Sequence, residues 1–147
     1  MSQDFKDMLL AFNAHEVQFM VVGAYAVTAY TSPRYTGDID YWVNPTPTNA
    51  KRVLQALIEF GAPIKDLTLE DLSKKGTIYQ IGVQPVRIDV ITKISGVEFE
   101  EAWEEKKQHL LFEVPIYIPS KKHLIQNKKA SGRPKDLLDV DELLKTE

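Results

Sequence analysis

The chain has 147 residues, of which 44% are hydrophobic and 27% are charged, as is usual for one globular domain. Its net charge of −3 argues against a non-specific nucleic-acid binder, and the absence of cysteine excludes disulfides and thiolate zinc sites. We predict a single domain over residues 1–147, with C-terminal helices at 120–145 packed on it.

Targeting signals are not evident. The longest apolar run, residues 19–27, is far shorter than the roughly 20 residues that a membrane-spanning helix needs. The N-terminal segment carries two acids and lacks the basic region of a signal peptide. We therefore expect a cytoplasmic protein with no membrane partner.

Apolar periodicity and the positions of glycine and proline predict the order of the elements. The predicted elements are a helix over 4–15, a strand over 17–22, a helix over 24–31, a strand over 38–43, a helix over 47–60, a short helix over 67–74, strands over 77–83 and 86–92, a helix over 99–107, a strand over 113–118, and helices over 121–131 and 134–145.

Several helices carry recognisable ends and faces. Thr46 is placed to cap the helix that begins at Pro47, and Gly61 is placed to end it. Two buried stripes are predicted: Val53, Leu54, Leu57 and Ile58 on this helix, and Leu137, Val140 and Leu144 on the last one.

The mixture of helices and strands favours an α/β (α+β) fold with a mixed β-sheet and helices mainly on one face. Strands 77–83 and 86–92 are expected to form a hairpin around Gln84-Pro85, which argues against a purely parallel sheet.

The most informative pattern is Asp38-Ile39-Asp40 on a predicted strand. Alternation puts both carboxylates on one face, where two close anions repel each other unless a cation lies between them. Magnesium prefers such oxygen ligands and keeps positions open for phosphate. The alternative is a pair of surface aspartates on an edge strand.

Two further features favour a cation site. Asp89 interrupts an apolar, β-branched strand that would otherwise belong in a core, although a solvent-facing edge position would also explain it. In addition, an apolar strand leads through Gly23 into a helix fifteen residues before Asp38, and a helix start suits phosphate.

Together these features resemble the nucleotidyltransferase superfamily typified by DNA polymerase β. The family pattern of apolar strand, glycine, helix, Asp-x-Asp and a later third acid matches Gly23-Ala24, Asp38-Ile39-Asp40 and Asp89. The segment from Leu124 to Asp136, with Gly-Arg-Pro-Lys-Asp near its end, is similar to small stand-alone prokaryotic members related to abortive-infection toxins.

The resemblance implies a nucleotidyltransferase fold and an activity that transfers a nucleoside monophosphate from a nucleoside triphosphate to a hydroxyl of a protein, RNA or small molecule. It also implies Mg²⁺ or Mn²⁺ as cofactor. The implied site consists of Asp38, Asp40 and Asp89 as metal ligands and catalytic residues, and Gly23, Ala24, Arg34, Thr36, Lys128 and Arg133 as nucleotide-binding residues.

Ala24 departs from the family, which usually has serine or glycine there, and it removes a hydroxyl that could bind phosphate. An alternative function is therefore a weakened nucleotide- or partner-binding module of a toxin–antitoxin type pair. A third possibility is a structural domain in which the three aspartates coincide by chance.

The basic residues also have simpler explanations. Arg34 could end a loop, Lys128 and Lys129 could form a solvated helix face, and Arg133 could pair locally with Asp136. His123 is expected to be polar surface near a helix start.

Overall fold

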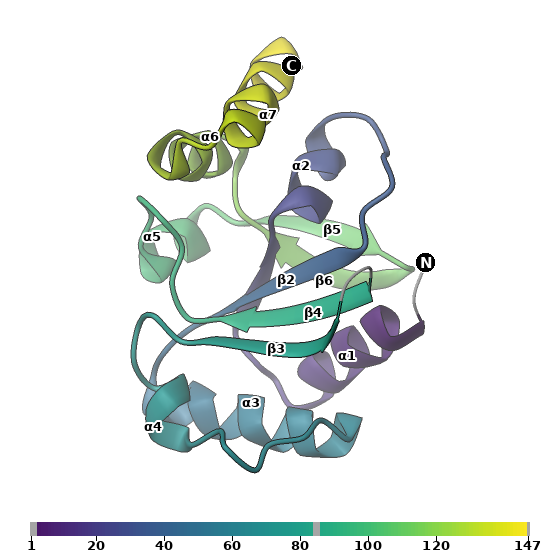
Figure 1. The fold of residues 1–147 in the computed structure, drawn as a ribbon, viewed down its shortest axis with the longest axis vertical. Coiled ribbons are helices and arrows are strands. Elements are labelled where there is room, and N and C mark those ends of the chain that lie inside the picture. The colour runs from purple at the N-terminus through teal and green to yellow at the C-terminus, as the bar shows by residue number, and fades with distance from the viewer. Residues whose placement is uncertain (1–2, 84–85, 147) are drawn as a thin grey trace.

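The computed structural model describes residues 3–83 and 86–146. Seven helices and six strands are assigned within these residues (Figure 1). They are α1 Gln3–Ala14, β1 Phe19–Val22, α2 Ala24–Tyr30, β2 Asp38–Val43, α3 Pro47–Phe60, α4 Leu69–Leu72, β3 Ile78–Val83, β4 Val86–Ile91, α5 Phe99–Glu104, β5 Lys107–Leu111, β6 Val114–Ile118, α6 Lys121–Ser131 and α7 Pro134–Lys145.

The central sheet is mixed, as predicted. Its strand order is β1-β2-β4-β3, with β2 and β4 parallel and both outer pairs antiparallel. The expected β3–β4 hairpin is confirmed by this pairing, while its turn at residues 84–85 lies outside the described residues. The register aligns Val22, Asp40 and Asp89 in one row across three strands.

One face of the sheet carries the larger core. Tyr41 of β2 is fully buried there and contacts the rings of Phe12 and Phe19, and α1 and α3 pack beside each other over this face (Figure 1). The α3 boundaries follow the predicted signals. Thr46 accepts a hydrogen bond from the Asn49 amide, and Gly61 adopts φ 92°, which favours glycine.

The α3 stripe differs from the prediction at one position. Ile58 is 55% exposed, whereas Ala56 is fully buried beside Val53 and Leu57. The helical periodicity was assigned correctly, but the buried face is rotated toward the smaller residue because α3 packs closely against α1 and α4.

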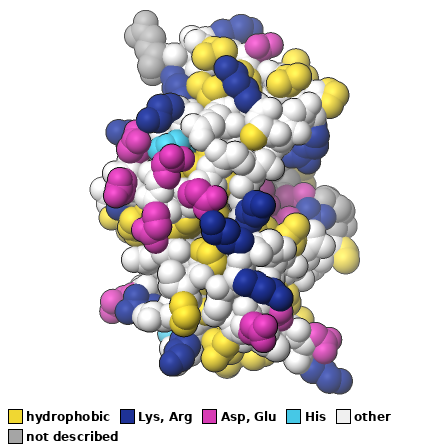
Figure 2. Space-filling model, turned by 90° about the vertical axis from the view of Figure 1, so that its left-hand side faces the viewer, with side chains coloured by type: hydrophobic (Ala, Val, Ile, Leu, Met, Phe, Trp, Pro, Cys, Tyr) yellow, Lys and Arg dark blue, Asp and Glu magenta, His cyan; other side chains and the backbone are white. Residues whose placement is uncertain are grey.

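The opposite face carries a smaller apolar cluster and, beyond it, the aspartates. Met20 and Trp42 pack there against Phe99 and Ala102 of α5. The other side of α5 is acidic and exposed, and Figure 2 shows acidic side chains gathered over this helix. The row containing Asp40 lies next to the row containing Trp42, so this face changes from apolar to charged along β2.

The C-terminal third contains two corrections. The helix predicted over 99–107 ends at Glu104, and Lys107–Leu111 forms β5, which pairs with β6 in a second sheet. Its polar, mostly exposed residues gave no clear strand signal. In α7, Leu137 and Leu144 are 48% and 62% exposed, and the buried positions are Asp136, Asp139, Val140 and Leu143.

Helices α6 and α7 pack against each other and both contact α2 (Figure 1). In the described part of the chain, every helix is too short or too polar to span a membrane.

Candidate nucleotidyl-transfer site

Two strands bring the aspartates together. In the parallel β2–β4 pair, Asp40 lies directly opposite Asp89, and Asp38 lies opposite Arg87. Strand alternation then places all four side chains on one face of the sheet. Asp89 is 7% exposed, so the edge-strand explanation of this acid does not apply: β4 is an inner strand between β2 and β3.

Arg87 was not among the predicted site residues. Its Nε donates to Asp89 Oδ1 at 2.8 Å and its Nη2 donates to Asp89 Oδ2 at 3.0 Å. Nη2 also lies 3.4 Å from Asp38 Oδ2. The signal that could have identified Arg87 is its position two residues before Asp89, which places it on the acidic face.

Asp40 is held in an environment that disfavours its charge. Burial, followed by the charge of Asp89, a side-chain hydrogen bond with Asp89 and the charge of Asp38, raises the pKa of Asp40 to about 7, while Lys128 opposes the shift. Gly23 is the close neighbour that makes this burial possible. A Cβ at position 23 would lie 2.3 Å from Asp40 Oδ2, and the φ of 69° also favours glycine.

We expect Asp40→Asn to stabilise the metal-free protein, and to do so more near pH 8 than near pH 5. The folded state keeps a proton on Asp40 up to about pH 7, whereas the ordinary value is 3.8. Unfolding therefore releases a proton between these values, and wild-type stability falls as pH rises through them. Thermal unfolding of both proteins across this pH range tests the expectation. An equal difference at every pH would contradict it.

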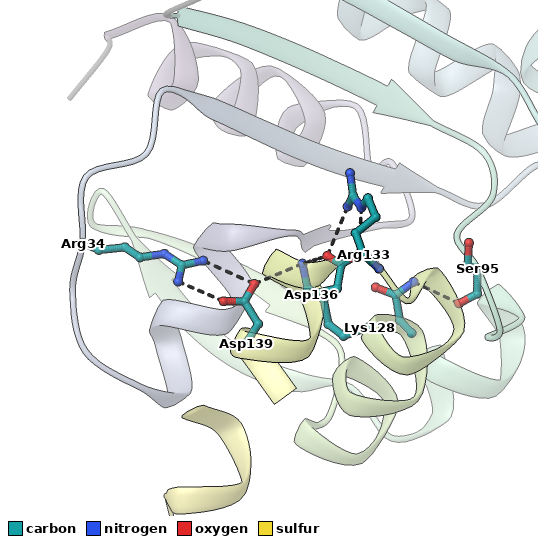
Figure 3. Close-up of polar contacts among 7 residues, drawn as sticks. Arg34, Ser95, Lys128, Arg133, Asp136 and Asp139 are labelled. Atoms are coloured by element: carbon teal, nitrogen blue, oxygen red, sulfur yellow. Dashed lines mark hydrogen bonds and ion pairs between the residues drawn. The ribbon is translucent and has the colours of Figure 1, made fainter. Parts of the chain in front are cut away.

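The cations come from three separate parts of the chain and form an alternating network with two carboxylates of α7 (Figure 3). Arg34 Nη1 lies 2.9 Å from Asp139 Oδ1, and Lys128 Nζ lies 3.3 Å from Asp139 Oδ2 and 3.4 Å from Asp136 Oδ1. Arg133 Nε donates to Asp136 Oδ2 at 2.7 Å. The predicted local pair of Arg133 and Asp136 is confirmed.

This network explains the charged residues that α7 buries. Burial alone would raise the pKa of Asp136, but the hydrogen bond from Arg133 and the charge of Lys128 lower it below its ordinary value. Lys128 is only 7% exposed, so its explanation as a solvated helix face is wrong. Neither Asp136 nor Asp139 was predicted as a site residue, because a leucine-based stripe seemed to account for the helix.

Asp38, Asp40 and the cations border a shared cleft, whereas Asp89 is not among the residues that line it. One hollow of about 340 Å³ is lined by Ile78, Ile91, Lys93 and Asn127, among others. A second of about 380 Å³ is lined by Ala24, Arg34, Thr36, Asp38 and Lys135, among others. Gly23, Asp40, Lys128 and Arg133 line both hollows.

Predicted and unpredicted residues shape this cleft. Thr36 borders it and donates from Oγ1 to the Asp38 carbonyl at 3.3 Å. Asn127 was not predicted; its Nδ2 donates to the Ser95 carbonyl at 2.9 Å and ties α6 to the segment that follows β4.

The prediction that His123 lies on the polar surface is wrong. This residue is 2% exposed, and its Nδ1 lies 3.1 Å from Ser120 Oγ, the side chain that caps α6. Its Nε2 lies 3.8 Å from Glu101 Oε1. His123 therefore lies on the side of α6 that faces α5.

The carboxylates are the type of ligand that binds a divalent cation, but the structure does not group them around one position. Asp40 and Asp89 offer hard oxygen donors in adjacent register, and a cation there would offset the burial and the neighbouring carboxylate charges that raise the pKa of Asp40. Over residues 3–83 and 86–146, however, no three acidic or histidine side chains are grouped closely enough to hold a metal ion. Arg87 contacts both oxygens of Asp89 instead.

Comparison with solved structures identifies the class of fold. The lincosamide antibiotic adenylyltransferase LnuA, in its lincomycin-bound form, aligns over 99% of this chain and 97% of its own, with a TM-score of 0.61 and 15% identity. A Thermotoga maritima protein classed as a nucleotidyltransferase aligns over 95% and 89%, with a TM-score of 0.63 and 12% identity. The fold is that of the nucleotidyltransferases, as the sequence resemblance implied.

The family is defined by sequence. The chain belongs to the family described as "Nucleotidyltransferase of unknown function (DUF6036)", whose profile matches residues 2–145. A search of curated proteins found no match.

Proposed function

We propose that the protein is a divalent-metal-dependent nucleotidyltransferase that moves a nucleoside monophosphate from a nucleoside triphosphate to a hydroxyl. The observation that carries this proposal is the position of Asp40, which lies in register with Asp89 on the neighbouring strand and borders a cleft that Lys128 and Arg133 also line. Phosphoryl-transfer catalysis depends mainly on positioning and electrostatic stabilisation, and these residue types supply both.

In the proposed reaction, the acceptor oxygen forms a bond to the α-phosphorus while the bond from that phosphorus to the β-bridging oxygen breaks, and pyrophosphate leaves. Asp38, Asp40 and Asp89 would hold the divalent cation, which supplies charge neutralisation of the phosphates and of the attacking oxygen. Asp89 would accept the proton of the attacking hydroxyl, since that role needs reach more than a special pKa.

The remaining cleft residues would bind the triphosphate. Lys128 and Arg133 border both hollows, and Arg34 and Thr36 border the one nearest Asp38. Their charges would neutralise the phosphate oxygens, with Gly23 and Ala24 contributing backbone amides. LnuA acts on an antibiotic, and a small-molecule hydroxyl is therefore included among the acceptors to be tested, beside protein and RNA.

We expect a nucleoside triphosphate to bind only when a divalent cation is present, because the aspartates repel a bare triphosphate. Calorimetric titration with Mg²⁺, and again with chelator, measures this difference. The matched control for the site is Asp141→Asn, which removes the same charge from an exposed position on α7. Equal affinity with and without chelator would contradict the metal requirement.

The activity itself is tested with nucleoside triphosphates that carry the label on the α-phosphate, incubated with protein, RNA and small-molecule fractions of a lysate. Wild-type protein should transfer label and release pyrophosphate.

A second function, nucleotide or partner binding without transfer, is favoured by Ala24, which begins α2 without a side-chain cap at its start. A toxin–antitoxin type partner belongs to this alternative. Metal-dependent binding of nucleotide without label transfer to any fraction would support it over the enzyme.

A further inference from the structure

Arg87 is a basic residue on β4, one of the two strands that carry the aspartates. Its side chain is 24% exposed, and it contacts Asp89 through two hydrogen bonds and Asp38 through a third, longer contact of 3.4 Å. Paired guanidinium–carboxylate bonds of this kind are stronger and more directional than single ones. Arg87 therefore bridges two of the three aspartates of the site.

The geometry of this pair conflicts with metal binding. Both oxygens of Asp89 accept from Arg87, and the same carboxylate lies beside Asp40 in the β2–β4 register. A divalent cation shared by Asp40 and Asp89 would lie within a few ångströms of the guanidinium, and two like charges at that distance repel strongly in a partly buried site. The cation and Arg87 cannot both keep their best contacts with Asp89.

We propose that Arg87 is a positioning residue that acts as a resident counter-ion: it holds Asp38 and Asp89 together when no metal is bound, and it must leave Asp89 when the divalent cation binds. This inference rests on the proposed metal site. It explains why the three aspartates share one face without forming a ready three-ligand group, since Arg87 occupies Asp89 on that face.

If Arg87 and the cation compete for Asp89, one substitution of Arg87 should lower the unfolding temperature and raise the affinity for Mn²⁺. Arg87→Gln removes the guanidinium and leaves an amide of similar reach. Without metal, the variant should unfold at a lower temperature than wild type, because the aspartates lose their counter-ion. Its affinity for Mn²⁺ should rise by about tenfold or more, because the cation no longer displaces a bound charge.

The experiment follows Mn²⁺ binding without nucleotide by the loss of the free-ion electron paramagnetic resonance signal. Arg52→Gln is the matched control, since it removes the same charge from α3, where Arg52 contacts only the Glu16 carbonyl among the contacts described. Arg52→Gln should bind Mn²⁺ as wild type does. Affinity of Arg87→Gln that is equal to or weaker than wild type would overturn the inference.

A second measurement uses the wild-type chain, so that it does not depend on how the variant folds. The Nε–H resonance of Arg87, assigned by its loss in Arg87→Lys, should exchange slowly with solvent in metal-free protein and lose that protection in saturating Mg²⁺. Protection that persists in saturating Mg²⁺ would overturn the inference.

A different result would defeat the proposed function instead. If wild type and Asp40→Asn bind Mn²⁺ with the same affinity, the aspartates are not the metal site.

Discussion

Label transfer from a nucleoside triphosphate is expected to fall by about a hundred- to a thousandfold when Asp40 is replaced by asparagine. Asp40 is the residue that borders both hollows and also lies in register with Asp89. In the proposed mechanism, loss of its charge removes a metal ligand, and the triphosphate loses the positioning on which the transfer depends.

Stability measurements and a matched control distinguish the loss of label transfer from damage to the fold. Asp40→Asn should fold at least as well as wild type above pH 7, where the raised pKa of Asp40 makes its charge costly. Asp141→Asn removes an equal charge from the exposed side of α7 and should leave the transfer rate unchanged. If Asp40→Asn keeps wild-type transfer, the reaction takes place elsewhere or comes from a contaminant.

The second large effect is expected on stability. Asp136→Ala should lower the free energy of unfolding by about 3 kcal/mol, the cost typical of breaking a buried ion pair. Asp136 is fully buried and accepts from Arg133 Nε, Arg133 Nη2 and Lys128 Nζ. Without it, the buried ammonium of Lys128 keeps the ion pair with Asp139 as its one remaining carboxylate contact among residues 3–83 and 86–146.

Thermal and urea unfolding measure this loss. For a chain of this size, ~3 kcal/mol corresponds to a decrease of roughly 6–12 °C in the melting temperature. Asp141→Ala, on the same helix but exposed, is expected to change stability by less than about 0.5 kcal/mol. Equal effects of the two substitutions would mean that the network contributes no more than a surface charge.

The features that sequence reasoning predicted well are those determined by neighbouring residues. Alternation along residues 38–43 was sufficient to place Asp38 and Asp40 on one face, and Thr46 and Gly61 marked the ends of α3 because capping is a local interaction. The resemblance in the segments around Gly23 and Asp38 led to the correct fold class.

The features that it missed depend on strand pairing or on tertiary contacts. β5 pairs with β6, the next strand along the chain, and this pairing stabilises a polar strand that has little periodicity of its own. The buried face of α7 could not be assigned from its leucines, because Asp136 and Asp139 turn inward to meet Lys128 and Arg34. His123 is buried at the start of α6, where it contacts Ser120 and faces Glu101 of α5.

The network of Arg34, Asp139, Lys128 and Asp136 also has a consequence for how the cleft is assembled during synthesis. Ribosomes make the acidic strand β2 early, whereas the residues that hold Lys128 in place belong to α7, the last helix described. A nascent chain that has already folded its sheet still lacks Asp136 and Asp139, the carboxylates that contact the ammonium group of Lys128. Completion of the cleft therefore waits until α7 has been made and has docked.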